Sequence, residues 1–408
     1  MLDEIVHGWE RDSAKATMRF GINAQRLTGQ RLGVGRYIEY LLKNWSRMLL
    51  LSDRISIYLR DPARVEDLML PPGSSFEMIH PRLSALLWEQ TTLPIRAKEL
   101  DVLFGPSYTL PLAYSGRCVV ATHSVNEKQP GAHPSWYFGH SQYYRLSARK
   151  ADAVIVPADA TKADVQEIYG IPPERVVVIP QGTDDCFQPN RDEKLLRDTR
   201  VRLLGEDRPY VLFVGKLSQR RNIPVLMEAF ARARKRAQLP HRLVLFGPNA
   251  VGTPLHEIAQ GLGISDLVVQ TDGKIASHRE LVPIYNAADV FVHPSLYEGW
   301  SMTTVEALAC GTAVIAANRG GLGEVAQGGA LLLDDLTPDT LADAIERVLT
   351  DAPLREELRQ RARQRGSQFR WDDVSRRTLD VLRAVAHGQP LDADTAGSGL
   401  PSQLRYGR

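Results

Sequence analysis

Two glutamates stand eight positions apart in a stretch whose pattern predicts a strand, a loop and a helix, residues 290–311. The apolar run 290–292 is long enough for a short buried strand. Glu298 falls in the loop, and Glu306 falls in the first turns of a helix that a glycine ends. Free amides at a helix start favour an anion, whereas carboxylates favour neutral hydroxyls. The pattern therefore predicts a ligand that carries both phosphate and sugar.

Cations follow another predicted strand, residues 210–214. Gly215 and Lys216 come directly after it, and Arg221 precedes the next predicted helix. Glycine allows close approach of the backbone to a ligand, and two cations suit the oxygens of a diphosphate. The alternative interpretation is an ordinary basic surface loop.

Further candidate site residues follow two other predicted strands. His123 comes directly after residues 118–122, at the edge of a parallel sheet where ligands bind. Lys274 and Ile275 follow residues 267–270 in a turn. A structural histidine and an ordinary turn are the alternatives for these positions.

The segment from Glu298 to Glu306, followed by ALACGTAVIAANRGG, resembles the signature of glycosyltransferase family four. Members of this family are retaining enzymes of the GT-B fold that use nucleotide sugars. The resemblance extends over about residues 18–385, and most of its specificity lies in residues 211–324. It leans towards bacterial polysaccharide mannosyl- or rhamnosyl-type transferases.

The resemblance implies roles for these residues. Glu298 and His123 become candidate catalytic residues, with Glu298 contacting the donor sugar and stabilising positive charge at its anomeric carbon. Glu306 would hold the ribose hydroxyls of the nucleotide. The alternatives are a solvated loop carboxylate for Glu298, and for Glu306 the partner of Thr303 in a capping box. The implied donor-binding set comprises Gly35, Gly215, Lys216, Arg221, Lys274, Ile275, Glu298, Ser301, Met302, Thr303 and Glu306.

The chain departs from the family pattern at three places. Residues 301–303 are Ser-Met-Thr where the family more often has Gly-Leu-Pro, which leaves a role for the backbone amides. Lys216 and Arg221 reverse the usual order of the two cations, which keeps the charge but changes the hydrogen-bond geometry. Ser124 follows His123, where an aspartate is usual.

The composition indicates a two-domain globular protein. The chain has 408 residues, of which 43% are hydrophobic and 24% charged, with a net charge of +2. Its three cysteines are far apart in sequence, which favours a reducing compartment. There is no secretory signal and no apolar run that approaches about 18 residues, so we expect a cytoplasmic protein.

Strands alternate with helical patterns in both halves, which predicts an α/β protein with mainly parallel sheets. By resemblance this is a GT-B fold, with two Rossmann-like domains that face each other across a cleft and a C-terminal helix that crosses back to the first domain. The predicted divisions are a disordered extension (1–17), an N-terminal acceptor domain (18–190), a C-terminal nucleotide-sugar domain (191–371), a crossover helix (372–387) and a disordered tail (388–408). The polar segment 185–208 is the expected linker.

We therefore expect a retaining glycosyltransferase that moves a sugar from a nucleotide sugar to a hydroxyl of a glycan or lipid-linked glycan acceptor in surface polysaccharide biosynthesis. No Asp-x-Asp motif is placed to bind a metal, so we expect no cofactor, and we expect no nucleic-acid partner. The alternatives are a GT-B hydrolase or epimerase, and a catalytically silent partner subunit that binds nucleotide sugar or glycan.

An aromatic and basic run, residues 136–150, allows a further contact. Together with Arg26, Arg31 and Arg36 it suits an acceptor groove or peripheral contact with the inner face of an anionic membrane. The interpretation that the sequence favours is a helix that packs its aromatic side chains into the core.

Overall fold

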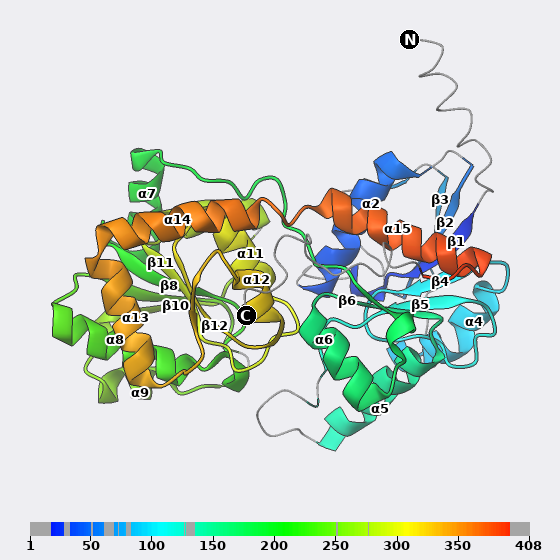
Figure 1. The fold of residues 1–408 in the computed structure, drawn as a ribbon, viewed down its shortest axis with the longest axis horizontal. Coiled ribbons are helices and arrows are strands. Elements are labelled where there is room, and N and C mark those ends of the chain that lie inside the picture. Colours follow the sequence, from blue (N-terminus) through cyan, green and yellow to red (C-terminus); the bar gives the residue numbers. More distant parts are fainter. Residues whose placement is uncertain are drawn as a thin grey trace, which may run out of the picture.

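The structure is a computed structural model that describes residues 18–27, 33–49, 52–60, 69–71, 73–78, 83–125, 127, 135–249, 252–275 and 277–391. The predicted extension 1–17, most of the predicted tail and Arg31 lie outside the described residues, as do the side chains of 135–138. The described chain forms two lobes, each built around one sheet (Figure 1).

The N-terminal domain contains a seven-stranded parallel sheet in its described part, in the order β3-β2-β1-β4-β5-β6-β7. Its strands are β1 (Arg19–Asn23), β2 (Arg54–Leu59), β3 (Ser74–Met78), β4 (Val102–Gly105), β5 (Cys118–Ala121), β6 (Ala153–Val156) and β7 (Val176–Val178). The helices include α2 (Val34–Met48), α3 (Ala85–Leu87), η2 (Trp88–Thr92), α4 (Leu93–Arg96), α5 (Ser135–Lys150) and α6 (Asp159–Asp164). The central strands are buried throughout because helices cover both faces.

The C-terminal domain repeats this architecture with a parallel sheet in the order β10-β9-β8-β11-β12-β13. The strands are β8 (Tyr210–Val214), β9 (Arg242–Phe246), β10 (Val268–Thr271), β11 (Val290–His293), β12 (Val314–Ala317) and β13 (Leu331–Leu333). Helices α7 (Glu193–Leu204), α8 (Ile223–Ala237), α9 (Leu255–Gly261), α10 (Leu281–Ala287), α11 (Met302–Ala309), α12 (Gly320–Ala326), α13 (Pro338–Thr350) and α14 (Ala352–Gly366) surround it. The predicted pair of Rossmann-like domains is confirmed.

The last helix, α15 (Trp371–His387), belongs to the N-terminal domain although it follows the C-terminal one. The chain leaves α14 and runs back to lie beside α2 (Figure 1). Its apolar residues join the core of the N-terminal sheet, and the indole Nε1 of Trp45 donates to the carbonyl of Ser375 at 2.9 Å. The predicted crossover helix is therefore confirmed.

The two domains also bond to each other directly. The carboxylate of Glu324 accepts hydrogen bonds from the backbone amides of Asp159 (2.9 Å) and Ala160 (2.6 Å), at the start of α6. The hydroxyl of Tyr297 donates to Asp164 at 2.8 Å. These contacts hold the carboxyl edges of the two sheets against each other.

Sequence patterns missed several elements. The polar segment expected as a linker contains α7, whose start is capped by Asp192 and whose end is marked by Gly205 at φ 78°. The helix packs on α10, but its many charged residues weaken the apolar period by which a helix is predicted. The edge strand β3 is short and mostly polar, and α12 begins with glycines that predict a turn. Within the described residues no helix has the length and apolar character needed to cross a membrane.

Candidate active site

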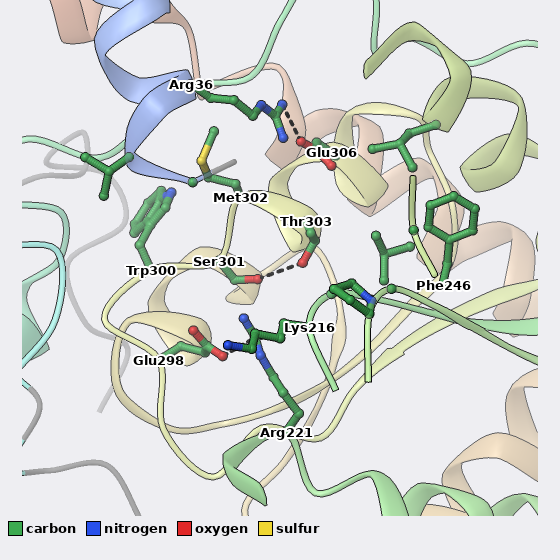
Figure 2. A pocket seen from close by; sticks show the side chains of 18 of the residues that line it. Arg36, Lys216, Arg221, Phe246, Glu298, Trp300, Ser301, Met302, Thr303 and Glu306 are labelled. Carbon is green, nitrogen blue, oxygen red and sulfur yellow. Dashed lines mark hydrogen bonds and ion pairs between the residues drawn. The ribbon is translucent and has the colours of Figure 1, made fainter. Parts of the chain in front are cut away.

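A cavity of about 590 Å³ lies between the domains, at the carboxyl ends of the sheet strands (Figure 2). Eleven of the twelve predicted site residues line it: His123, Gly215, Lys216, Arg221, Lys274, Ile275, Glu298, Ser301, Met302, Thr303 and Glu306. Gly35 does not, because it is buried inside α2, and its neighbours Gly33, Val34 and Arg36 line the cavity instead. The structure therefore brings eleven of the predicted residues together around one cavity and places Gly35 outside its lining.

Glu298 is paired with two arginines from the loop after β8. Its Oε1 lies 2.5 Å from Nη1 of Arg220 and also contacts Nη1 of Arg221, and the residue is only 4% exposed. Burial raises the pKa of Glu298, but Arg221 and Arg220 outweigh that effect and hold it well below its usual range. The carboxylate is therefore ionised and not a solvated loop residue. Arg220 was not in the predicted set, although its basic neighbour was.

His293 connects this ion pair to the start of α11. Its Nε2 lies 2.5 Å from Nη1 of Arg221, and its Nδ1 lies 2.8 Å from the hydroxyl of Thr304. A guanidinium can only donate, so Nε2 accepts and Nδ1 carries the hydrogen. Burial lowers the pKa of His293 to about 4, which keeps the ring neutral. In the sequence His293 stands directly after the predicted strand 290–292, without a further signal of its role.

The helix α11 begins at Ser301, whose hydroxyl accepts a hydrogen bond from the backbone amide of Thr304 at 3.3 Å. The capping box of Thr303 and Glu306, the alternative interpretation for Glu306, is therefore not formed. The amides of residues 302 and 303 stand at the N-terminal end of the helix and both residues line the cavity, as an anion site requires.

Glu306 instead forms a bridge between the domains. Its Oε1 lies 2.6 Å from Nη2 of Arg36 on α2, and its Oε2 accepts from the hydroxyl of Tyr285 at 2.8 Å. The Arg36 and Glu306 side chains are 6% and 1% exposed (Figure 2). Burial lowers the pKa of Arg36, but Glu306 and Tyr40 together raise it above its usual value. Arg36 also lines the cavity between the domains, whereas the sequence grouped it with an aromatic run.

His123 is held by protein groups on both sides of its ring. Nε2 lies 2.8 Å from the carbonyl of Pro106, and Nδ1 lies 2.7 Å from the side-chain nitrogen of Gln181. Burial lowers the pKa of His123 to about 4. The ring is thus a neutral part of the wall, with both nitrogens engaged.

The remaining predicted residues lie at the exposed side of the cavity. Lys216 is exposed and points in the same region as Arg221 and Glu298 (Figure 2). Lys274 pairs with Asp272 at 3.0 Å, and Ile275 packs against the core of the C-terminal domain. Within the described residues no group of three or more potential metal ligands is present.

Comparisons with known proteins identify the family of this chain. Residues 32–186 match the model described as Glycosyltransferase Family 4, and residues 197–365 match Glycosyl transferases group 1. The alpha-maltose-1-phosphate synthase of Mycolicibacterium smegmatis is 30% identical over 67% of this chain and 75% of that protein. The chain belongs to family 4 of the glycosyltransferases.

Other relatives match a smaller part of this chain. The D-inositol 3-phosphate glycosyltransferase of Corynebacterium urealyticum is 33% identical, and the match spans 61% of each chain. Among solved structures, sucrose-phosphate synthase from Thermosynechococcus elongatus (TM-score 0.73, 21% identity, 91% of this chain and 100% of that one) has the same fold. So does Anabaena HepE in complex with UDP and glucose (TM-score 0.73, 19% identity, 90% and 100%).

Proposed function

We propose that this glycosyltransferase transfers a sugar, with retention of configuration, from a nucleoside diphosphate sugar to a hydroxyl group of a glycan or lipid-linked glycan. The observation that carries the proposal is the cavity itself. An ionised, buried Glu298 stands there beside two arginines, a lysine and the start of a helix. Cations and free amides suit a diphosphate, and the carboxylate suits sugar hydroxyls.

In this proposal the groups divide the work. Lys216, Arg220 and Arg221 neutralise the negative charge of the leaving diphosphate. In other enzymes a metal ion neutralises this charge. When the donor binds, Glu298 exchanges its arginine partners for sugar hydroxyls, and it stabilises the positive charge that develops at the anomeric carbon as the bond to the diphosphate breaks. The acceptor attacks from the face of the leaving phosphate, whose oxygen takes the acceptor proton. The closed domains exclude water.

In this proposal the nucleoside binds to the part of the cavity that is lined by Glu306 and residues 273–275. Glu306 has two oxygens, each engaged by one protein group, and a carboxylate accepts about four hydrogen bonds in total. A ribose diol can therefore be added to Glu306 while Arg36 stays close. Residues 273–275 also line the cavity, and in this proposal their backbone contacts the base.

The test is a screen for release of nucleoside diphosphate from sugar nucleotides of UDP, GDP and dTDP. Mannose and rhamnose donors are the predicted ones, and glucose and galactose donors are included. We expect release with at least one donor, and its loss in Glu298→Ala. A wild-type chain that binds donors without turning them over would instead be a binding subunit, and turnover with no acceptor product would indicate a hydrolase.

A further inference from the structure

The tyrosine directly before Glu298 reaches across to the N-terminal domain. The hydroxyl of Tyr297 accepts a hydrogen bond from the backbone amide of Val125, in the loop after β5, at 3.0 Å. The same hydroxyl donates to Oδ2 of Asp164, the last residue of α6, at 2.8 Å. Burial and the nearby charge of Asp164 raise the pKa of Tyr297 well above its usual value, so the hydroxyl keeps the proton that it donates. One side chain of the C-terminal domain is thus bonded to two groups of the other domain.

The glycine directly after Glu298 is held by the N-terminal domain as well. The carbonyl of Gly299 accepts a hydrogen bond at 3.1 Å from the hydroxyl of Thr161, which is buried on α6. A β-carbon at Gly299 would overlap the carbonyl oxygen of His123, so the loop also touches the end of β5. The helix α6, which lies where the two lobes meet, therefore bonds to the residues on both sides of Glu298 (Figure 1).

Glu298 itself is held by the C-terminal domain. Its carboxylate points toward Arg221 (Figure 2) and pairs with both Arg220 and Arg221, in the segment after β8. Its carbonyl accepts a hydrogen bond from the amide of Gly321, on α12, at 2.9 Å. Arg220 also donates to the carbonyl of Tyr297 at 3.1 Å. Both domains therefore hold this loop, and a change in their spacing would pull the two sets of hydrogen bonds apart.

We propose that Tyr297 is a positioning residue for sugar transfer, which sets the place of Glu298 through the bonds of its hydroxyl to Asp164 and Val125; this rests on the proposed transferase function. Tyr297 is outside the described lining of the donor cavity, so it acts through Glu298 and not on the substrate. A catalytic group that is misplaced by about 1 Å can lower the rate about 100-fold. Because these bonds form only while the domains touch, Glu298 is in place only in the closed protein, from which water is excluded.

The experiment compares Tyr297→Phe, which removes only the hydroxyl, with Tyr210→Phe as a matched control. Tyr210 is also buried, and its hydroxyl donates to the carbonyl of Ile284 at 2.6 Å. Both of these residues belong to the C-terminal domain, and neither is in the described lining of the donor cavity. The assays are release of nucleoside diphosphate from UDP-glucose, UDP-galactose, GDP-mannose and dTDP-rhamnose, calorimetric affinity for UDP and GDP, and amide hydrogen exchange of residues 294–301.

We expect Tyr297→Phe to lower kcat with the fastest donor about tenfold or more, while the Kd for UDP and GDP changes less than about threefold. Amide exchange of residues 294–301 should become faster, because fewer bonds hold the loop. The control should change neither kcat nor this exchange. Asp164→Ala should reproduce the loss of kcat, and Asp164→Asn, which keeps an oxygen that accepts from the Tyr297 hydroxyl, should restore most of it.

The outcomes separate the positioning role from the transferase function. An unchanged kcat in Tyr297→Phe overturns the positioning role and leaves the transferase function standing. An equal loss of kcat in Tyr210→Phe, or an equal loss of UDP and GDP affinity in Tyr297→Phe, overturns it as well, because either marks general destabilisation. If Tyr297→Phe does not fold, equal kcat values of Asp164→Asn and Asp164→Ala overturn it. A wild type that releases no nucleoside diphosphate from any of the four donors refutes the transferase function itself, and the positioning role with it.

Discussion

The bridge between Arg36 and Glu306 gives the sharpest test of how the two domains are held together. We expect Arg36→Met to lower the melting temperature of the ligand-free protein substantially. Methionine keeps the length and apolar stem of the side chain, so the variant removes the charge and leaves most of the packing. What remains is a carboxylate that is 1% exposed, with the hydroxyl of Tyr285 as its remaining hydrogen-bond donor among the described residues.

The magnitude follows from burial. Exposed ion pairs contribute about 0.2–1 kcal/mol, but removal of one partner from a buried pair costs about 3–5 kcal/mol. Because the hydrogen bond from Tyr285 to Glu306 remains, we expect the free energy of unfolding to fall by the lower end of this range, about 3 kcal/mol. For domains of this size, 1 kcal/mol corresponds to roughly 2–4 °C, so the melting temperature should fall by about 6–12 °C.

The assay is differential scanning calorimetry of Arg36→Met, Glu306→Gln and the double variant. A neutral glutamine needs no cation beside it, so the double variant should melt higher than the sum of the two single effects implies. Arg361→Met is the matched control, because that arginine pairs with Glu357 on the surface of α14, where both side chains are about half exposed. We expect the control to change stability by less than about 1 kcal/mol.

The reasoning is refuted if Arg36→Met melts within about 2 °C of the wild type, as the exposed control should. It is also refuted if the effects of the two single substitutions simply add. Either result would mean that the bridge contributes no more than a surface pair.

Three further outcomes follow from the site. We expect Glu298→Gln to reduce the rate of sugar transfer at least about 100-fold while nucleoside diphosphate still binds, because the arginine partners remain. Steady-state kinetics measures the transfer and calorimetry the binding. An unchanged rate of transfer would exclude a catalytic role for Glu298. A β-carbon at Gly299 would lie 2.0 Å from the carbonyl oxygen of His123, so Gly299→Ala should hinder domain closure and lower kcat/KM by about tenfold or more. The control is Gly261→Ala, whose β-carbon would meet nothing within 4 Å and should leave kcat/KM unchanged. Equal kinetics of the two variants would refute the close approach. The pKa of His293 is lowered from 6.5 to about 4, so the unfolded chain gains a proton first as pH falls and stability is lost between about pH 6.5 and 4, by up to about 1.4 kcal/mol per pH unit. His293→Gln should therefore show a shallower fall of melting temperature over that window, and an identical slope would contradict the buried neutral ring.

Much of this protein was determined by local sequence. Alternating apolar runs and helical periods predict two parallel α/β domains, because period and punctuation depend on neighbours along the chain. The same applies to residues that follow strands directly. Glu298, Lys216 and His123 had to lie at the carboxyl edge of a sheet, since parallel strands all end there. The elements that were missed, such as α7, have polar surfaces that weaken the periodic signal.

Only the tertiary structure decided which of these groups face each other. Arg36 and Glu306 are 270 positions apart, and no local pattern indicates that α2 and α11 bring them within 2.6 Å. The proton position on His293 likewise depends on partners from other elements. Pairing, burial and the pKa shifts that follow from them are properties of distance in space. Sequence spacing specifies that distance only within one helix, strand or turn. The charge states of the site residues therefore follow only from the structure in which the two sheets are packed together.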